Sequence, residues 1–121
     1  MSKTVMLIDD SPTVRQVMRF AFEHAQYTVI EAGDGESALQ SLDGRKVSAI
    51  VCDIAMPNLD GLAFLKAMRE KHDYRFTPVV MLTTESRAQK KQQAKDSGAT
   101  AWATKPCPPS ELVDLVNRLT V

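Results

Sequence analysis

The feature that most constrains this chain is a regular alternation between short apolar runs and longer segments with helical spacing. The apolar runs are rich in β-branched residues and cover residues 4–9, 27–32, 48–54, 77–84 and 100–104. After most of them, apolar residues recur every three or four positions, which is typical of helices with one buried face. Five strand–helix units in succession predict an α/β fold, in which helices cover both faces of a parallel sheet.

Local signals mark the ends of the predicted helices. Ser11 and Pro12 suit the N-cap and first turn of the first helix. Its expected apolar stripe consists of Val14, Val17, Met18, Ala21 and Ala25. Further helices are expected over residues 33–42, 61–71 and 85–97, and over a last segment with Leu112, Leu115, Val116 and Leu119 on its apolar face. Segment 85–97 has few apolar residues, so we expect either a lightly packed, solvated helix or an element that can shift.

Length and composition exclude several classes of protein. A chain of 121 residues, 44% of them hydrophobic, fits one domain over residues 1–121, and we expect no output domain after it. Fifteen basic and fifteen acidic residues cancel, which gives no reason to expect nucleic acid or a membrane surface as partner. No apolar run is long enough to span a membrane, and the N-terminus turns acidic too early for a signal peptide. We therefore expect a soluble, cytoplasmic monomer.

Polar side chains follow four of the predicted strands at their carboxyl ends. Asp9 and Asp10 follow the first strand, and Asp53 follows the third. Thr83 and Lys105 stand at the ends of the fourth and fifth. Ligands of open parallel sheets bind beyond these ends, where the strand order reverses. If the order is 2-1-3-4-5, the three carboxylates meet there.

A lone aspartate after a strand is usually a helix cap or turn residue. Three of them, with a hydroxyl and an ammonium group at matching positions, favour a ligand site. Carboxylates in one cleft repel one another and raise one another's pKa values, and Lys105 supplies only one positive charge. A divalent cation is the natural remaining counter-charge, and oxygen ligands with room for water and phosphate suit Mg²⁺.

The same positions resemble a known family over the whole chain. The segments that carry the resemblance are LIDDS, VCDIAMPNLDG, VVMLTTE and WATKP. They are similar to the receiver domain of two-component response regulators, and in particular to stand-alone chemotaxis receivers of the CheY type. The resemblance implies a doubly wound, flavodoxin-like (βα)5 three-layer sandwich with a parallel five-stranded sheet of order 2-1-3-4-5. It also implies a signalling receiver that assists its own phosphorylation and dephosphorylation, and not an enzyme.

The resemblance implies a role for each residue of the cluster. Asp53 would accept a phosphoryl group from the phosphohistidine of a histidine kinase. Lys105 and Thr83 would contact the phosphoryl oxygens. Mg²⁺ would be held by Asp10, Asp53 and the backbone carbonyl of Ala55, with Asp9 acting mainly through a bound water. These roles fit the chemistry, because phosphoryl transfer depends on positioning and charge neutralisation more than on covalent help.

The resemblance also implies a switch. A phosphoryl group adds about −1.5 to −2 charges, towards which Thr83 would move while Trp102 turns inward. The output face would consist of helix 85–97, strand 100–104 and the last helix. Trp102 replaces the more usual Tyr or Phe, and Cys107 stands where an aromatic is common. Lys105-Pro106 matches a position where the family often has a cis peptide bond.

Partners follow from the same resemblance. His24 and His72 lie in no phosphohistidine motif and are expected on the surface, so the kinase should be another protein. The leading effector is the flagellar motor switch, and a phosphatase is a further possible partner. A phosphate sink or a regulator of a non-flagellar partner remains an alternative.

Other functions fit the sequence less well than a receiver does. Residues 33–38 fit Gly-x-Gly-x-x-Ala, a dinucleotide motif, but the acidic Asp34 and Glu36 would repel a pyrophosphate. We expect Asp34 to cap a helix instead. A Mg²⁺-dependent aspartyl-phosphate phosphatase would usually carry an acid/base two residues after Asp53, where this chain has Ala55. An adaptor that works without phosphorylation would not need the intact acid cluster.

Overall fold

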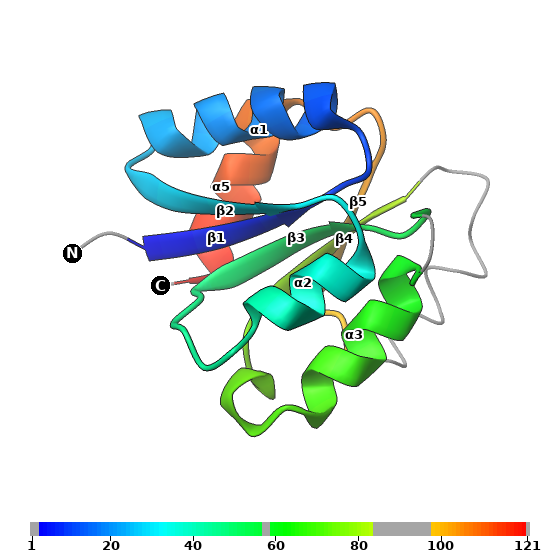
Figure 1. The fold of residues 1–121 in the computed structure, drawn as a ribbon. Helices are drawn as coiled ribbons and strands as arrows, with labels where there is room; N and C mark the ends of the chain where they lie inside the picture. Colours follow the sequence, from blue (N-terminus) through cyan, green and yellow to red (C-terminus); the bar gives the residue numbers. More distant parts are fainter. Residues whose placement is uncertain (1–2, 57–58, 84–97, 121) are drawn as a thin grey trace.

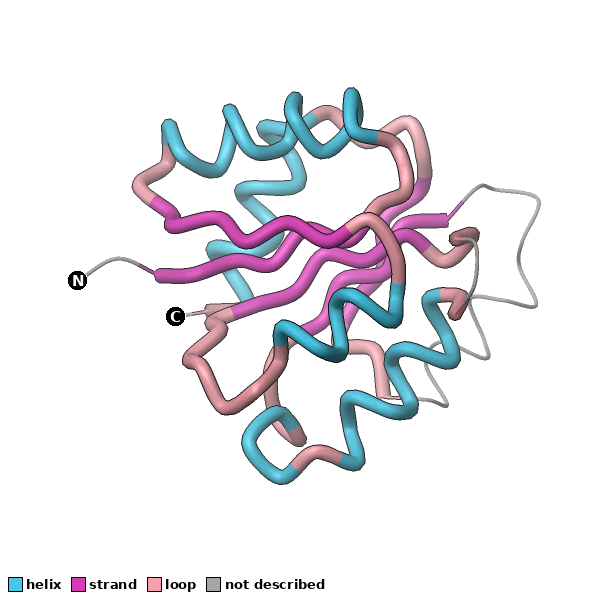
Figure 2. Tube along the Cα trace, in the orientation of Figure 1, coloured by secondary structure: helices cyan, strands magenta, loops and turns pink. Residues whose placement is uncertain are grey.

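One parallel sheet forms the centre of the molecule, described here by a computed structural model over residues 3–56, 59–83 and 98–120. Its strands are β1 (Lys3–Ile8), β2 (Tyr27–Ala32), β3 (Ala49–Asp53), β4 (Val79–Thr83) and β5 (Ala101–Thr104). Their order is β2-β1-β3-β4-β5, and all neighbouring strands are parallel. Figure 2 shows these strands at the centre of the molecule, with helices on either side. The predicted α/β fold and the order 2-1-3-4-5 are confirmed.

Helices cover both faces of the sheet (Figure 1). On one face lie α1 (Pro12–His24) and α5 (Pro109–Leu119), and on the other lie α2 (Gly35–Ser41) and α3 (Gly61–Glu70). A short 3-10 helix (His72–Tyr74), which was not predicted, follows α3. The helix predicted over residues 85–97 lies outside the described residues. Among the helices that the structure describes, none combines the length and apolar character needed to cross a membrane.

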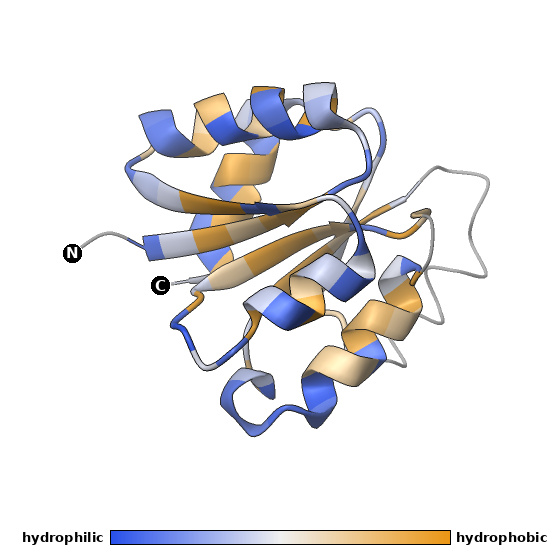
Figure 3. Cartoon of the chain, in the orientation of Figure 1, coloured by the Kyte–Doolittle hydropathy of each residue, from blue (hydrophilic) through white to orange (hydrophobic). Residues whose placement is uncertain are grey.

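Two apolar layers hold the helices to the sheet, because successive strand residues point to opposite faces. The layer under α1 and α5 includes Val5, Leu7, Phe22, Val51, Leu82, Leu112 and Val116. The layer under α2 and α3 includes Ile8, Ile50, Cys52, Phe64, Leu65, Met68 and Met81. Figure 3 shows the apolar colouring of the central strands between the two pairs of helices. The sandwich thus has three layers, as expected.

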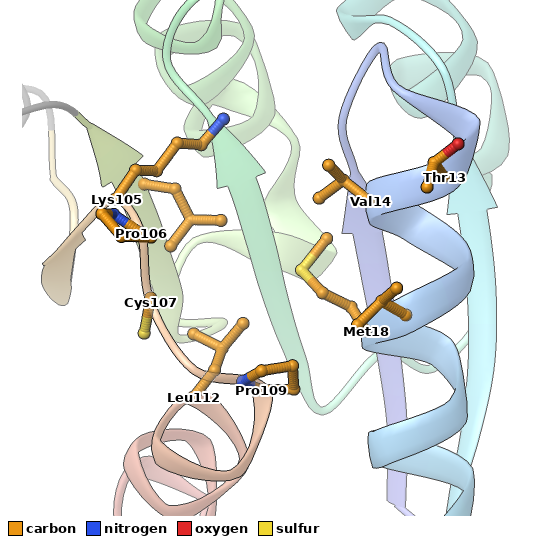
Figure 4. Close-up of a pocket in the computed structure, with 10 residues that line it drawn as sticks. Thr13, Val14, Met18, Lys105, Pro106, Cys107, Pro109 and Leu112 are labelled. Atoms are coloured by element: carbon orange, nitrogen blue, oxygen red, sulfur yellow. The ribbon is translucent and has the colours of Figure 1, made fainter.

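The buried face of α1 differs from the predicted stripe. Met18 and Phe22 are buried, but Val14 and Val17 are 38% and 52% exposed. Both valines line a groove between α1 and the segment that connects β5 to α5, where Figure 4 shows Val14. Periodicity alone gives the apolar side of a helix and not how closely a distant segment packs against it, which is why these two valines were misplaced.

The turn before α2 has the structure expected of a helix start and not of a nucleotide site. Asp34 is the N-cap, and its carboxylate accepts a hydrogen bond of 2.7 Å from the Ser37 backbone N–H. A Cβ at Gly35 would lie 2.6 Å from the Leu59 carbonyl oxygen, so glycine here permits close packing against another segment. The motif follows β2, which lies at the edge of the sheet, away from the central strand ends.

Candidate functional site

Side chains from four strands meet at the carboxyl ends of the sheet. Asp9 directly follows β1, Asp53 ends β3, Thr83 ends β4 and Lys105 directly follows β5. Oxygen atoms of the Asp9, Asp10 and Asp53 carboxylates all lie within 4.8 Å of one another. Folding therefore brings together the acids that the sequence places far apart, and the parallel register of β1 and β3 is the cause.

Asp53 is held by two donors. Its Oδ2 accepts a hydrogen bond of 2.8 Å from Lys105 Nζ, and its Oδ1 accepts one of 3.2 Å from the Ala55 backbone N–H. The Asp53 side chain is buried, whereas that of Lys105 is about one-third exposed, at 32%. Burial would lower the pKa of Lys105, but the hydrogen bond to Asp53 and the carboxylates nearby outweigh it, and the pKa is raised. Lys105 therefore keeps its charge at neutral pH.

Asp9 is almost completely buried, at 1% exposure. Its Oδ1 accepts a hydrogen bond of 2.9 Å from the Ser11 backbone N–H. Its Oδ2 lies 3.6 Å from Lys105 Nζ, too long for a hydrogen bond, and finds no hydrogen-bond partner within the described part of the chain. Burial raises the pKa of Asp9, although the Ser11 N–H and the Lys105 charge oppose that shift. A buried carboxylate oxygen without a donor indicates a cation ligand.

The residues present fit a divalent cation. Three carboxylates and one ammonium group leave two negative charges uncompensated among these side chains. Asp10 is exposed, so water can reach this side of the cluster. An open, all-oxygen site of this kind is what Mg²⁺ prefers. The role of the Ala55 carbonyl as a further ligand stays a prediction.

The two predicted switch residues lie on neighbouring strands. Thr83 is buried at the end of β4 and pairs with Thr104 of β5. Trp102 is half-buried in β5 and packs against the apolar layer under α2 and α3. The Lys105 backbone N–H donates to the Thr83 carbonyl at 2.7 Å, which ties the end of β5 to the end of β4. The Lys105-Pro106 bond is cis, as the resemblance implied.

Two features of this end of the sheet were not predicted. Arg15 of α1 donates a hydrogen bond from Nη1 to the Asp9 carbonyl oxygen. A groove of about 460 Å³ opens between α1 and the segment after β5, with Lys105 at one end and Leu112 on its wall (Figure 4). No sequence signal distinguishes Arg15 from the other basic residues. The groove depends on how two segments far apart in the sequence pack, which the sequence pattern does not give.

Comparisons of sequence give consistent relatives. Residues 5–117 match the family model described as the response regulator receiver domain. The alkaline phosphatase synthesis transcriptional regulatory protein PhoP of Bacillus subtilis (strain 168) is 32% identical over 112 residues, which cover 93% of this chain and 46% of PhoP. An uncharacterized 14.6 kDa protein of Leptolyngbya boryana is 32% identical over 114 residues, which cover 94% of this chain and 87% of that protein. The chain thus spans about half the length of PhoP.

Solved structures agree with the sequence comparisons. The chemotaxis response regulator CheY4 of Vibrio cholerae has a TM-score of 0.92 and 38% identity, over 98% of this chain and 99% of that one. A putative response regulator of Chloroflexus aurantiacus has a TM-score of 0.93 and 30% identity, over 99% and 98% of the two chains. Both likenesses extend over almost the whole of each chain.

Proposed function

The chain belongs to the family of response regulator receiver domains of two-component systems, and we propose that Asp53 is its phosphoacceptor. One observation carries this proposal: Asp53 ends a fully buried central strand and lies beside both Lys105 and the two other acids. Members of this family receive their phosphoryl group from a histidine kinase and act on an effector. The proposal therefore concerns which residues of this chain perform these steps.

The transfer would use few groups of the protein. An Asp53 carboxylate oxygen attacks the phosphorus of phosphohistidine, the P–N bond breaks, and its electron pair returns to the imidazole nitrogen of the kinase. Lys105 stays protonated and neutralises the phosphoryl oxygens as they leave the histidine. Asp10, Asp53 and the Ala55 backbone carbonyl would hold Mg²⁺, with Asp9 acting mainly through a bound water, and the ion supplies further charge neutralisation when bound. The chain is then a signalling receiver and not an enzyme acting on a separate substrate.

The signal would leave through Thr83 and Trp102. The Lys105 backbone N–H donates a hydrogen bond to the Thr83 carbonyl. A phosphoryl group on Asp53 that attracts either side chain would therefore also pull on the end of β5. Trp102 lies in that strand and is only half-buried, so its surroundings can change. The effector would then bind the face formed by β5 and α5, together with the segment before β5.

A role in chemotaxis, at the flagellar motor switch, is the finer proposal. Its support is the likeness to CheY4, which covers nearly all of both chains. The similarity to PhoP covers only about half of that transcriptional regulator, so a phosphate sink or control of a non-flagellar partner is the alternative. The alternative of another class, a Mg²⁺-dependent aspartyl-phosphate phosphatase, is disfavoured because Ala55 stands where such an enzyme usually carries its acid/base. The proposed setting is a cytoplasmic monomer.

The test compares the wild type with Asp53→Asn. Each protein is incubated with Mg²⁺ and acetyl phosphate, its intact mass is measured after rapid quenching, and the fluorescence of the single tryptophan, Trp102, is followed. We expect one phosphoryl group on the wild type, none on the variant, and a fluorescence change only in the wild type. Equal uptake by Asp53→Asn would overturn the assignment. Binding of purified motor switch protein, before and after phosphorylation, then tests the chemotaxis role.

A further inference from the structure

Arg15 makes a contact that the phosphoacceptor chemistry does not itself require. The side chain lies between α1 and the end of β2 and is 17% exposed. Its Nη1 donates to the backbone carbonyl oxygen of Asp9, and its Nε donates to Glu31 Oε1 at 3.1 Å. One guanidinium group thus connects the turn after β1, which carries Asp9 and Asp10, to the Glu31 carboxylate on the neighbouring strand. Arginine suits this position because its guanidinium group is a rigid, forked donor.

The Asp9 carbonyl needs this partner because the sheet no longer provides one. The last residue pair of the β1–β2 ladder is Ile8 with Ala32, and the Asp9 N–H still donates to the Ala32 carbonyl at 3.2 Å. Beyond that bond the chain leaves the strand and turns into α1. A backbone carbonyl beside a buried residue is normally hydrogen-bonded, and Arg15 performs this function here.

The bonded carbonyl belongs to the peptide group that joins Asp9 to Asp10. Its orientation fixes the N–Cα bond of Asp10, and with it the point from which the Asp10 side chain starts, because the peptide group is planar. Asp10 is exposed, whereas Asp9 is buried and its carboxylate accepts a hydrogen bond from the Ser11 backbone N–H. The Arg15 contact therefore bears directly on where the backbone of Asp10 lies relative to Asp9 and Asp53.

Glu31 holds Arg15 in place and offsets its charge. The Glu31 carboxylate accepts from Arg15 and, at 2.6 Å, from Arg19 Nη1. The hydrogen bond from Arg19 is the largest cause of the lowered pKa of Glu31, which is ionised at neutral pH. Arg19 also pairs with Glu23 at 3.1 Å. Arg19 provides a matched control, since it shares Glu31 with Arg15 but, among the described residues, makes no hydrogen bond to Asp9 or Asp10.

We propose that Arg15 is a positioning residue for the carboxylate cluster: anchored on Glu31, it orients the Asp9–Asp10 peptide and thereby sets the affinity of the cluster for Mg²⁺. The inference rests on the proposed function. Residues that hydrogen-bond to metal ligands without touching the metal commonly weaken metal affinity by about 10-fold to 100-fold when they are replaced. Because Arg15 acts on the backbone next to Asp10 and not on its carboxylate, we expect its removal to weaken Mg²⁺ binding by about 10-fold.

The experiment measures Mg²⁺ affinity by calorimetric titration of the unphosphorylated protein. Arg15→Met, which keeps the apolar stem, should weaken Mg²⁺ binding about 10-fold, and the control Arg19→Met should change it less than about twofold. Glu31→Gln should have an intermediate effect, because Arg15 can still reach the Asp9 carbonyl. The double variant Arg15→Met/Glu31→Gln should bind Mg²⁺ no more weakly than Arg15→Met alone, since Glu31 acts through Arg15.

Thermal unfolding without Mg²⁺ shows whether a variant is folded, and Arg15→Lys provides a second test if Arg15→Met is not. A lysine keeps the charge but cannot form the fork, so we expect it to restore only part of the affinity. Equal Mg²⁺ affinity in the wild type and both Arg15 variants, or equal losses in the Arg15 and Arg19 variants, would overturn the inference. If the wild type itself neither binds Mg²⁺ nor takes up phosphate, the proposed function is wrong, and the role of Arg15 is rejected with it.

Discussion

The strands β3 and β5 deliver residues to the same site, yet they differ sharply in burial. All five residues of β3 are buried, whereas all four residues of β5 are half-buried. β3 has a hydrogen-bonded strand on each side, and β5 is the last strand of the described sheet, beside β4. Asp53 therefore stands on a part of the sheet with little freedom, while Lys105 and Trp102 belong to a part that can adjust at lower cost.

This difference matches the division of work in the proposed function. A phosphoacceptor must stay aligned with the acids beside it, which a central strand packed on both faces ensures. A residue that reports the phosphoryl group must move, which is easier at an edge strand with fewer buried contacts. The hydrogen bond from the Lys105 backbone to Thr83 connects the two parts. Substitutions in the two strands test whether they differ in this way.

The largest effect is expected from a cavity in β3. Ile50 is completely buried in the layer under α2 and α3, so Ile50→Ala should lower the free energy of unfolding by about 3 kcal/mol. Trp102→Phe in β5 removes part of a half-buried ring and should cost less than about 1.5 kcal/mol. Urea unfolding followed by far-UV circular dichroism measures both values. Equal losses would show that β5 is as tightly constrained as β3.

Gly61 offers a second way to disturb the central strand. A Cβ at this position would lie 2.5 Å from the Asp53 carbonyl oxygen and 2.8 Å from Ile54 Cα, so backbone would have to move. We expect Gly61→Ala to cost about 2 kcal/mol and to slow phosphoryl uptake from acetyl phosphate. For stability alone the control is Gly33→Ala, whose Cβ would meet the end of the Arg15 side chain at 3.4 Å and no backbone atom.

Gly33→Ala should change the free energy of unfolding by less than about 0.5 kcal/mol. The free energy of unfolding is measured for both variants by urea titration, and the rate of phosphoryl uptake is compared between Gly61→Ala and the wild type. A Gly61→Ala protein with wild-type stability and rate would mean that the backbone around Asp53 yields easily, which would contradict the rigid assignment of β3.

The sequence predicted the strand framework well, because each strand is a local apolar run. Tyr27–Ala32 was expected with the bounds that the structure has, and β3 lost only one residue at each end of the predicted range. The convergence of Asp9, Asp10 and Asp53 followed from the strand order that the resemblance to receiver domains implied, together with the rule that ligands bind where that order reverses.

What the sequence could not predict depends on contacts between distant segments. The Arg15 bond to the Asp9 carbonyl requires the exact exit of the chain from β1. Val14 and Val17 are apolar and correctly spaced, but they line the groove between α1 and the segment after β5 and stay exposed. Phe22, one residue after Ala21 of the predicted stripe, is completely buried in the layer under α1 and α5 and was not predicted.

A smaller effect on stability, but a clear one on signalling, is expected from Thr83→Ala. The variant should lose about 1 kcal/mol and still accept a phosphoryl group on Asp53. Because Thr83 ends β4 beside β5, its loss should reduce the Trp102 fluorescence change on phosphorylation by at least about half if it carries the switch. The control is Thr28→Ala on the exposed side of β2. A full fluorescence response would remove Thr83 from the switch.

The smallest effect concerns the other edge strand, β2, which unlike β5 is tied to its covering helix by ion pairs. Glu31 accepts hydrogen bonds from Arg15 and Arg19, and the bond from Arg19 is the main cause of its lowered pKa. A carboxylate whose pKa is lower in the folded chain binds fewer protons there than in the unfolded chain. Its contribution to stability is therefore present above the ordinary pKa of 4.5 and is lost as the pH falls through the lower, folded value.

Glu31→Gln should accordingly lower the free energy of unfolding at neutral pH by less than about 1 kcal/mol, because the pair is partly exposed and screened by solvent. The difference from the wild type should shrink as the pH falls below 4.5 and should also decrease with added salt. Urea unfolding at several pH values measures it, and Glu36→Gln, on the exposed first turn of α2, removes the same charge without an ion pair. If the Glu31→Gln difference were independent of pH, the ion pairs would contribute nothing to holding β2, and the two edge strands would be alike.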